Sequence, residues 1–522
     1  MSLRIAAAIL VALMACGWPG AAQHEQHNQL GDVTFPTSCD PKVQAEFERG
    51  VAMLHSYWFN YAGKTFRGIL EQDPTCAMAH WGIAMDLLGN TLSGPPSPQA
   101  AREAWAVLEK VKGIEVKTGR EREWIDALRT YFRDHDRVGV EVRLRAYNRA
   151  MQALAERHQD DFEAQVYAAL TLQAAADKND VTYRDQAKSA AILEKLYAKN
   201  PQHPGITHYL IHAYDFAPMA DKGIPAARRY AGIAPAVPHA RHMPAHIYSM
   251  VGMWEDSIAS NLSALEIQPD YYHAADFTVY AHLQLAQDRT AAALIEKALK
   301  TPERGDRPSS MSNFTAKAAM PARYALERAD WAAAAALSFT PTAYPQADAL
   351  TRFARALGLA RIGKLAEASA EIKALEALRA ALAKSGDTYW AARTDEQILA
   401  ASAWLAYTGA RTSGIDLLRR AAAGEDGSIK HVAMENRLYP MRELYAEYLL
   451  NAGVARDALL EYEKALKQNP NRFRALYGAA RAAEAAGNRK KAVDYYSKLI
   501  ELAKKGDGTR PELTHARAYV QG

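Results

Sequence analysis

The sequence predicts an all-α protein, an α-solenoid of stacked antiparallel helix pairs, and two observations support this prediction. The first is a repeat: Pro201, Pro235 and Pro269 follow one another at intervals of 34 residues. The second is that apolar residues recur at helical spacing through most of the chain, in segments separated by turn-forming residues. A period of about 34 residues is typical of a two-helix unit, which cannot bury its apolar face alone and therefore stacks on its neighbours.

The composition fits one long array and argues against some functions. The chain has 522 residues and a formal net charge of +4, with 63 Lys and Arg against 59 Asp and Glu. Positive and negative residues are interleaved and form no long basic stripe, so nucleic-acid binding is not indicated. Beyond the N-terminus no apolar run approaches the roughly 20 residues needed to cross a bilayer.

The N-terminus predicts export. Arg4 precedes an apolar run from Ile5 to Ala15, and small residues lead to a cleavage site after Ala22, so residues 1–22 resemble a secretory signal peptide. The alternative is a lipoprotein signal that ends before Cys16, with Cys16 lipidated. The two interpretations place the protein in the periplasm or lipid-anchored in the cell envelope, and membrane contact is expected only through such an anchor.

Residues 23–42 lack helical periodicity and are expected to form an irregular leader. After removal of the signal, Cys39 and Cys76 are the remaining cysteines. In an oxidising compartment such a pair is expected to form a disulfide, which would join the leader to the second repeat and contribute about 4 kcal/mol in the chain-entropy model. Two buried free thiols are the alternative.

The helical repeats divide into two arrays, residues 43–300 and 313–522, with a polar segment at 301–312 that we predict to be a hinge. The first array opens with small and aromatic residues at the spacing of a closely packed helix pair: Phe47, Gly50, Ala62, Phe66 and Pro74. Less regular amphipathic segments follow at 121–132, 142–157, 162–176 and 183–199. The last helix of the second array is expected to act as a cap.

With this repeat pattern, the chain resembles tetratricopeptide-repeat (TPR) proteins over nearly all of its mature length, most specifically at 47–82, 205–269 and 439–500. More narrowly, the stretches 47–82, 208–215, 239–254 and 320–328 resemble an exported bacterial TPR family to which we assign no reaction. The resemblance implies a right-handed superhelix whose concave groove, lined by the first helix of each pair, binds extended peptides or partner helices. The chain departs from that family at residues 432–436, where a segment containing proline and glycine is expected.

Histidines gather in the repeats of residues 201–284. Half of the 16 histidines lie between residues 203 and 282. The 34-residue interval relates His208 to His242 and Asp276, His212 to His246 and Tyr280, and His239 to His273. Residues four apart share a helix face. Pro244 is compatible with a helix that starts near Ala240, because a first-turn amide has no intrahelical acceptor. The predicted groove residues are His208, His212, Asp215, His239, His242, His246, His273, Asp276 and Tyr280.

Two histidines at positions i and i+4 can chelate one ion, and two such pairs complete a tetrahedral site. The predicted zinc or copper ligands are His208, His212, His242 and His246, supported by Asp215, His239, His273 and Asp276. Without metal, the same histidines would hydrogen-bond one another, the two aspartates or the carboxylate of a bound peptide. A metal site requires nitrogens that converge to about 2.0–2.1 Å from one point, whereas a binding module presents them along an open groove.

The sequence favours a non-catalytic role. It lacks a phosphate-binding Gly-Lys-Ser/Thr loop, a Gly-x-Ser-x-Gly elbow and a haem-attachment motif, and both histidine pairs lack the glutamate of a zinc hydrolase. The leading hypothesis is an exported scaffold that binds a protein or peptide partner in its groove. The alternative is a periplasmic metal-binding protein or metalloenzyme with its site on residues 205–284.

Overall fold

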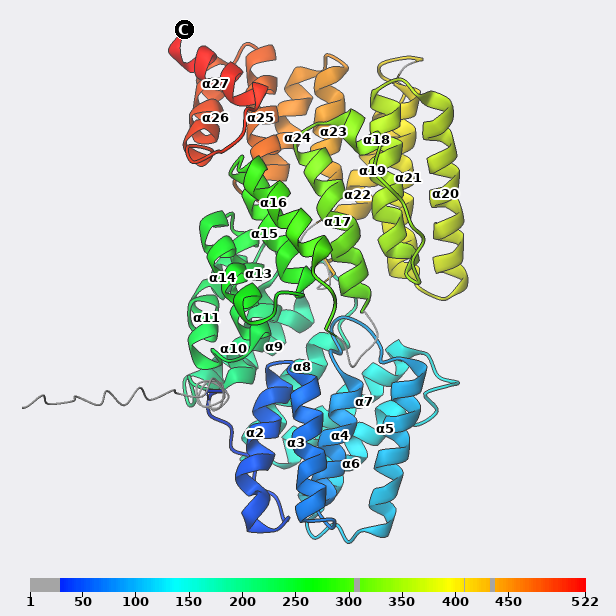
Figure 1. Cartoon of the computed structure of the whole chain (residues 1–522), viewed down its shortest axis with the longest axis vertical. Coiled ribbons are helices and arrows are strands. Elements are labelled where there is room, and N and C mark those ends of the chain that lie inside the picture. Colours follow the sequence, from blue (N-terminus) through cyan, green and yellow to red (C-terminus); the bar gives the residue numbers. More distant parts are fainter. Residues whose placement is uncertain (1–28, 305–309, 408, 432–436) are drawn as a thin grey trace, which may run out of the picture.

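The computed structural model describes residues 29–304, 310–407, 409–431 and 437–522. The predicted signal peptide with Cys16, the first residues of the leader, residues 305–309 of the predicted hinge and the departure at 432–436 lie outside this part. All regular elements within it are helices. As the sequence predicts, the fold is an all-α, TPR-like α-solenoid of antiparallel helix pairs (Figure 1).

The first part of the array, blue to cyan in Figure 1, occupies one end of the molecule. Its helices are η1 (Pro41–Val43), α2 (Gln44–His55), α3 (Phe59–Gln72), α4 (Ala77–Leu88), α5 (Pro98–Lys110), η2 (Val111–Gly113), α6 (Gly119–Phe132), α7 (Val140–Arg157), α8 (Phe162–Ala174) and α9 (Arg184–Tyr197). The leader is irregular but anchored, because Phe35 is fully buried between the rings of Phe47 and Trp124.

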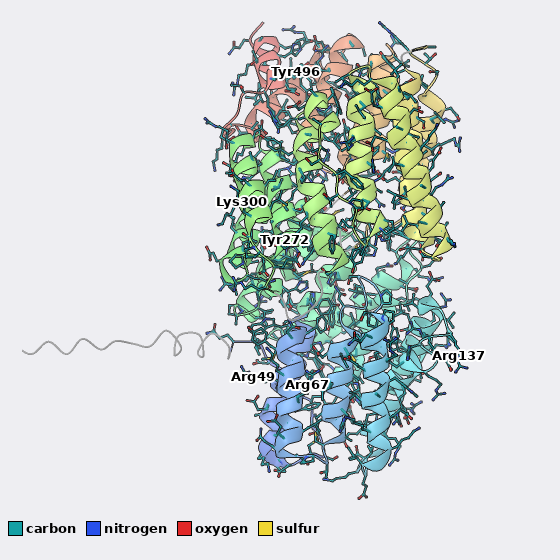
Figure 2. The ribbon with its side chains drawn as sticks, turned by 45° about the vertical axis from the view of Figure 1, so that its right-hand side comes forward. Arg49, Arg67, Arg137, Tyr272, Lys300 and Tyr496 are labelled. Atoms are coloured by element: carbon teal, nitrogen blue, oxygen red, sulfur yellow. A yellow bond between two sulfur atoms is a disulfide. The ribbon has the colours of Figure 1, made fainter. Side chains whose placement is uncertain are left out.

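The middle part, drawn in green, carries the histidine-rich repeats. Its helices are α10 (Pro204–Tyr214), α11 (Ala220–Ile233), α12 (Pro238–His242), α13 (Pro244–Met250), α14 (Trp254–Ile267), α15 (Tyr272–Gln284) and α16 (Asp288–Lys300). Tyr272, labelled in Figure 2, donates a hydrogen bond from its hydroxyl to the carbonyl of Thr301 at 2.6 Å. The first residue of the predicted hinge is thus held to the start of α15.

The last part runs from α17, drawn in green beside the middle part, to the red helix at the opposite end of the molecule. Its helices are α17 (Met311–Glu327), α18 (Trp331–Ala335), α19 (Pro345–Arg361), α20 (Leu365–Lys384), α21 (Thr388–Ala406), α22 (Ile415–Asp426), α23 (Met441–Asn451), α24 (Ala455–Gln468), α25 (Phe473–Ala485), α26 (Arg489–Leu502) and α27 (Pro511–Gln521).

Close helix packing follows from the small residues of the repeat. A Cβ atom added to Gly50 would lie 2.7 Å from the Phe66 ring, and one added to Gly82 would lie 2.5 Å from the same ring. Both glycines therefore let α2 and α4 approach the ring that α3 places between them. Phe66 is fully buried there, in the structural role that the repeat pattern predicts.

One helix boundary differs from the prediction. Instead of a helix starting near Ala240, α12 starts at Pro238, and the helix is interrupted at Met243 before α13 begins with Pro244. Proline lacks the amide hydrogen that the carbonyl of Ala240 would accept, so the first helix ends and Pro244 opens a second one. The histidines on the two sides of this break still share one face, as described below.

The C-terminal repeats fold back onto the middle of the chain. The Trp254 indole donates a hydrogen bond to the carbonyl of Asn471 at 2.8 Å, and Arg510 pairs with Asp288. Helix α15 also contacts both α17, which is close to it in the sequence, and α25, which is far from it. The array is therefore closed by contacts between repeats more than 200 residues apart, whereas a simple solenoid has contacts only between adjacent repeats.

The sulfur atoms of Cys39 and Cys76 lie at a disulfide distance, 2.06 Å apart, between the leader and the start of α4. None of the helices within the described ranges combines the length and the apolar character needed to cross a membrane.

Candidate metal centre

Six histidines converge on the inner face of three consecutive repeats. Helix α10 carries His208 and His212, helix α15 carries His273, and the two short helices between them carry His239, His242 and His246. Five of the six side chains are buried, and His239 is partly buried. The imidazoles form two groups, which we call the first triad (His208, His212 and His239) and the second triad (His242, His246 and His273).

In the first triad, the Nε2 atom of His208 lies 3.1 Å from Nε2 of His212 and 3.0 Å from Nε2 of His239. The two histidines of α10 are one turn apart, so their rings project side by side. His239 reaches them from the next repeat. Three imidazole nitrogens from two repeats therefore face one common point.

The second triad repeats this arrangement. The Nε2 atoms of His242 and His246 lie 3.0 Å apart, although the helix break at Met243 separates the two residues. His273 completes the group from the following repeat, and the candidate ligand atoms of the triad all lie within 4.8 Å of one another. The 34-residue period maps each member of the first triad onto a member of the second, so the triads are copies of one local structure.

In three of the six histidines the second ring nitrogen is held by a hydrogen bond to a surrounding acceptor, whereas Nδ1 of His212 is buried without a partner among the described residues. Nδ1–H of His208 donates to the carbonyl of His55 at 2.6 Å, and Nδ1–H of His246 donates to Asp215 at 2.8 Å. Nδ1–H of His242 donates to the side-chain oxygen of Asn261 at 2.6 Å. The amide nitrogen of Asn261 donates to the carbonyl of Ser257, which fixes the oxygen toward the imidazole. In metal sites, ligand histidines are oriented by acceptors of this kind.

These acceptors determine which nitrogen carries the proton. A neutral imidazole has one N–H, and in His208, His242 and His246 it lies on Nδ1. Their Nε2 atoms therefore carry lone pairs. In the second triad two such lone pairs face each other at 3.0 Å, with no proton of their own to share. This contact is repulsive unless a cation lies between the nitrogens.

Burial disfavours the protonated form that would relieve this repulsion. Desolvation lowers the pKa of His208 to about 3 and that of His242 to about 4, and it holds the pKa of His246 well below its ordinary value. The imidazoles are consequently neutral at physiological pH. A metal ion would supply the positive charge that a proton does not.

Asp215 links the second triad to the C-terminal array. Both of its carboxylate oxygens accept from Lys430, at 2.9 and 2.8 Å, while Oδ2 also accepts from His246. Burial raises the pKa of Asp215 and the Lys430 ammonium opposes that shift. The ion pair balances the charge of the carboxylate, and it places a residue of the second array against the histidine cluster.

The next repeat breaks the pattern. The period places Asp276 and Tyr280 where His242 and His246 stand one repeat earlier. Asp276 pairs with the fully buried Arg323, and the Tyr280 hydroxyl accepts from Arg472. Arginine side chains thus provide the positive charge at this position, and the histidine triads end at α15.

A third buried group, formed by His55, Glu163 and His203, has the composition of a metal site but a different hydrogen-bond pattern. Each histidine lies 2.8 Å from one oxygen of Glu163 through Nε2. Nδ1 of His203 accepts from the amide of Ile206, and Nδ1 of His55 contacts the Tyr209 hydroxyl. The Nε2 protons therefore point at the carboxylate, and no lone pair is left to bind an ion. The group supports the first triad, because the carbonyl of His55 orients His208.

The predicted ligands and groove residues lie together but not as predicted. We predicted either one ion held by His208, His212, His242 and His246, or an open binding groove lined by the nine residues. The structure instead assigns the two pairs to different triads and adds His239 and His273, which were predicted to have a supporting role. Asp215 contacts His246, as a supporting residue does. Asp276 and Tyr280 belong to the arginine cluster beside the triads, and the predicted groove residues are largely buried.

Several residues around the triads were not predicted. The carbonyl of His55 is a backbone group, which no side-chain pattern reveals. Asn261 and Tyr271 lie on neighbouring segments, and Lys430 comes from the other array. The sequence feature that comes closest to indicating these residues is the run of histidine and aromatic side chains at the end of the first repeat helix, which includes His55 and Tyr57.

Fold and site together define an all-helical repeat protein with a buried cluster of six histidines. No model of a protein family matches the chain, and no curated protein matches it. Among solved structures, the human IFIT1 dimer with m7Gppp-AAAA is similar at a TM-score of 0.40, with 11% identity over 94% of this chain and 96% of that one. The APC/C hetero-tetramer Cut9-Hcn1 is similar at a TM-score of 0.30, with 11% identity over 92% and 89% of the chains.

Proposed function

We propose that this protein is a metalloprotein that binds two transition-metal ions, one in each histidine triad. The observation that supports the proposal most directly is the 3.0 Å contact between the Nε2 atoms of His242 and His246. The hydrogen bonds at Nδ1 leave both nitrogens with lone pairs directed at each other. Metal coordination turns this repulsive contact into a favourable one.

The distances within the triads suit small divalent ions. Two nitrogen ligands bound at about 2.0–2.1 Å in a tetrahedral site lie about 3.3 Å apart. The contacts of 3.0 and 3.1 Å between these nitrogens are slightly shorter, so these pairs need to separate by only a few tenths of an ångström to bind one ion. A set of three imidazoles suits zinc and copper, and it leaves one coordination position open.

Export of the chain, which the N-terminal sequence predicts, fits this role, because it would place the centre in the periplasm or at the cell envelope. The scaffold that binds a protein or peptide partner in its concave groove also stays a prediction. The nine residues predicted to line a binding groove do not support that hypothesis, because most of them are buried inside the protein.

The experiment is elemental analysis of the purified, untagged mature protein after incubation with zinc or copper and removal of free metal. Four variants are compared with the wild type: His208→Ala, His242→Ala, the double variant, and His135→Ala as a control outside the triads. We expect two ions in the wild type and the control, one in each single triad variant and none in the double variant. Protein that stays free of metal, or metal that survives in the double variant, would refute the proposal.

A further inference from the structure

We infer that the two triads are not equivalent, and that the ion of the first triad is the one that takes a small external ligand, whereas the ion of the second triad is sealed. The inference rests on the proposed function. The ligand class is a molecule of two or three atoms that bonds directly to the metal through nitrogen or oxygen. The difference comes from the aromatic ring that covers each triad.

Phe277 covers the second triad. Its ring centroid lies 5.0 Å from that of His242, 4.7 Å from that of His246 and 5.0 Å from that of His273. The phenylalanine is fully buried on α15 and offers no polar atom. With the Asp215–Lys430 ion pair beside His246, this ring keeps water and small solutes away from the second ion.

Tyr57 covers the first triad in the corresponding way. Its ring lies 4.5 Å from His208, 5.2 Å from His239 and 6.1 Å from His212. Tyr57 is only partly buried as a residue, and its hydroxyl is a buried donor that has no hydrogen-bond partner among the described residues. A buried donor without a partner is costly, so this hydroxyl is available to a ligand.

The backbone at Tyr57 is unusual as well. Its φ of +53° lies in the left-handed region, which a bulky residue seldom adopts and which costs of order 1–3 kcal/mol. The strained residue directly follows His55 and Ser56, whose segment holds His208 through a carbonyl. Strain of this kind persists where the surrounding structure fixes a side chain in one place, and here it fixes the ring over the first triad.

Tyr57 also borders a cavity. The cavity measures about 10 Å³ and is lined mainly by aromatic and apolar side chains, among them Leu54, Tyr147, Tyr167 and Tyr209. The hydroxyl of Tyr167 has no partner either, although this residue is almost fully buried. The space fits about one water-sized molecule, and two phenol donors without partners border it.

Size and lining together define what the first ion accepts. A bulky substrate does not fit in this space, whereas a small molecule bonded to the open fourth position of the first ion would lie beside the Tyr57 ring. The second ion would have the same three nitrogen ligands, but the Phe277 ring that covers it offers no hydrogen-bond donor. It is suited to hold the repeats together or to influence the first ion.

Azide binding to the copper(II)-loaded protein tests the inference, because copper(II) azide complexes absorb light in a charge-transfer band. We compare His242→Ala, which retains only the first triad, with His208→Ala, which retains only the second. Copper content is measured first on both variants. We expect the azide band in His242→Ala and none in His208→Ala. A band of equal strength in both variants, or only in His208→Ala, would overturn the inference.

The wild type provides a second measurement that does not depend on the folding of either variant. It should bind one azide for every two copper ions, and Tyr57→Phe should bind both copper ions but hold azide more weakly. Two azides per protein, no azide on copper-loaded protein, or unchanged affinity in Tyr57→Phe would each contradict the inference. Failure to load copper at all would instead refute the proposed function, so the two failures can be told apart.

Discussion

At the scale of single residues, the acceptors around the histidines orient the proposed metal ligands. Asn261 is the clearest case, because its side-chain oxygen accepts the hydrogen bond from Nδ1–H of His242. We expect Asn261→Ala to weaken metal binding at the second triad by about 10- to 100-fold, because His242 is then free to rotate and to change its protonated nitrogen.

The measurement is a chelator competition in the His208→Ala background, where only the second triad is loaded. The matched control is Asn261→Ala in the His242→Ala background, where only the first triad is loaded and affinity should not change. An equal loss in the two backgrounds would mean that Asn261 acts through general stability.

A second residue-scale prediction concerns acid stability. Burial raises the pKa of Glu447, but Arg361, Arg474 and the Tyr439 hydroxyl outweigh burial and lower the pKa to about 2. Because this folded-state pKa lies below the unfolded value of about 4.3, the carboxylate stabilises the fold above pH 4.3, and that contribution is lost as the pH falls toward 2. Its size is roughly 3 kcal/mol at most.

Glu447→Gln should therefore melt at a lower temperature than the wild type at pH 7, and the difference should shrink steadily between about pH 4.3 and 2. Thermal melts followed by circular dichroism across this range give the comparison. A gap between the two melting temperatures that stays constant with pH would show that the stabilisation does not depend on the charge of Glu447.

The sequence predicted the histidine pairs well because a one-turn spacing fixes a shared helix face, whatever the tertiary structure. It also related His239 to His273 through the period. What it could not supply was the third ligand of each triad, since that depends on how closely consecutive first helices approach. The carbonyl of His55 acts across 153 residues, and the spacing of side chains contains no trace of it.

At the scale of helices, close approach between α10 and α2 positions the first triad. A Cβ atom added to Gly205 would lie 2.4 Å from Nδ1 of His55, a contact that forces the imidazole to move. His55 carries the carbonyl that orients His208. We expect Gly205→Ala to destabilise the protein by about 1–3 kcal/mol and to weaken the first triad more than the second.

Gly232→Ala is the matched control, because Gly232 lies on the exposed side of α11 with nothing within 4 Å of the added Cβ. It should leave metal binding unchanged and stabilise the helix by up to about 1 kcal/mol. Denaturant unfolding and metal titration of both variants are the measurements. A Gly205→Ala variant that behaves like Gly232→Ala would show that the contact with His55 can relax without consequence.

Helix boundaries were predicted to within a few residues where amphipathic periodicity is regular, as in α7, expected at 142–157 and observed at Val140–Arg157. The error near Ala240 has a local cause. Pro238 is suited to the first position of a helix, so the helix begins there. Pro244 then lies beyond the first turn of that helix, where its missing amide hydrogen cannot be tolerated. Two prolines six residues apart produce two short helices.

At the scale of the whole molecule, the closure of the array was not predictable from the repeats. It depends on buried ion pairs between distant residues, such as Arg472 with Glu443 and Glu327 and Arg510 with Asp288. A charge pattern along the sequence does not reveal which arginine is buried against which carboxylate. The consequence is that the three repeats of the metal centre are also held by the last helices of the chain.

This closure leads to the final prediction: metal should stabilise the whole protein and not only the histidine repeats. The centre joins α2 through His55, the three histidine-bearing repeats through their imidazoles, and the second array through Lys430. A ligand that binds only the folded state adds about 4 kcal/mol per site when its free concentration is 1,000 times the dissociation constant. Zinc should therefore raise the temperature of a single, cooperative unfolding transition.

The test is calorimetry of the wild type and of the His208→Ala/His242→Ala double variant, each with a chelator and with added zinc. We expect a rise in the wild type and none in the double variant, because the latter has lost a ligand from each triad. The outcome against the prediction is two separate unfolding transitions, of which zinc raises the melting temperature of only one. The arrays would then unfold separately, and the buried ion pairs would not couple them. If zinc raises the melting temperature of the double variant equally, the stabilising ion binds away from the triads.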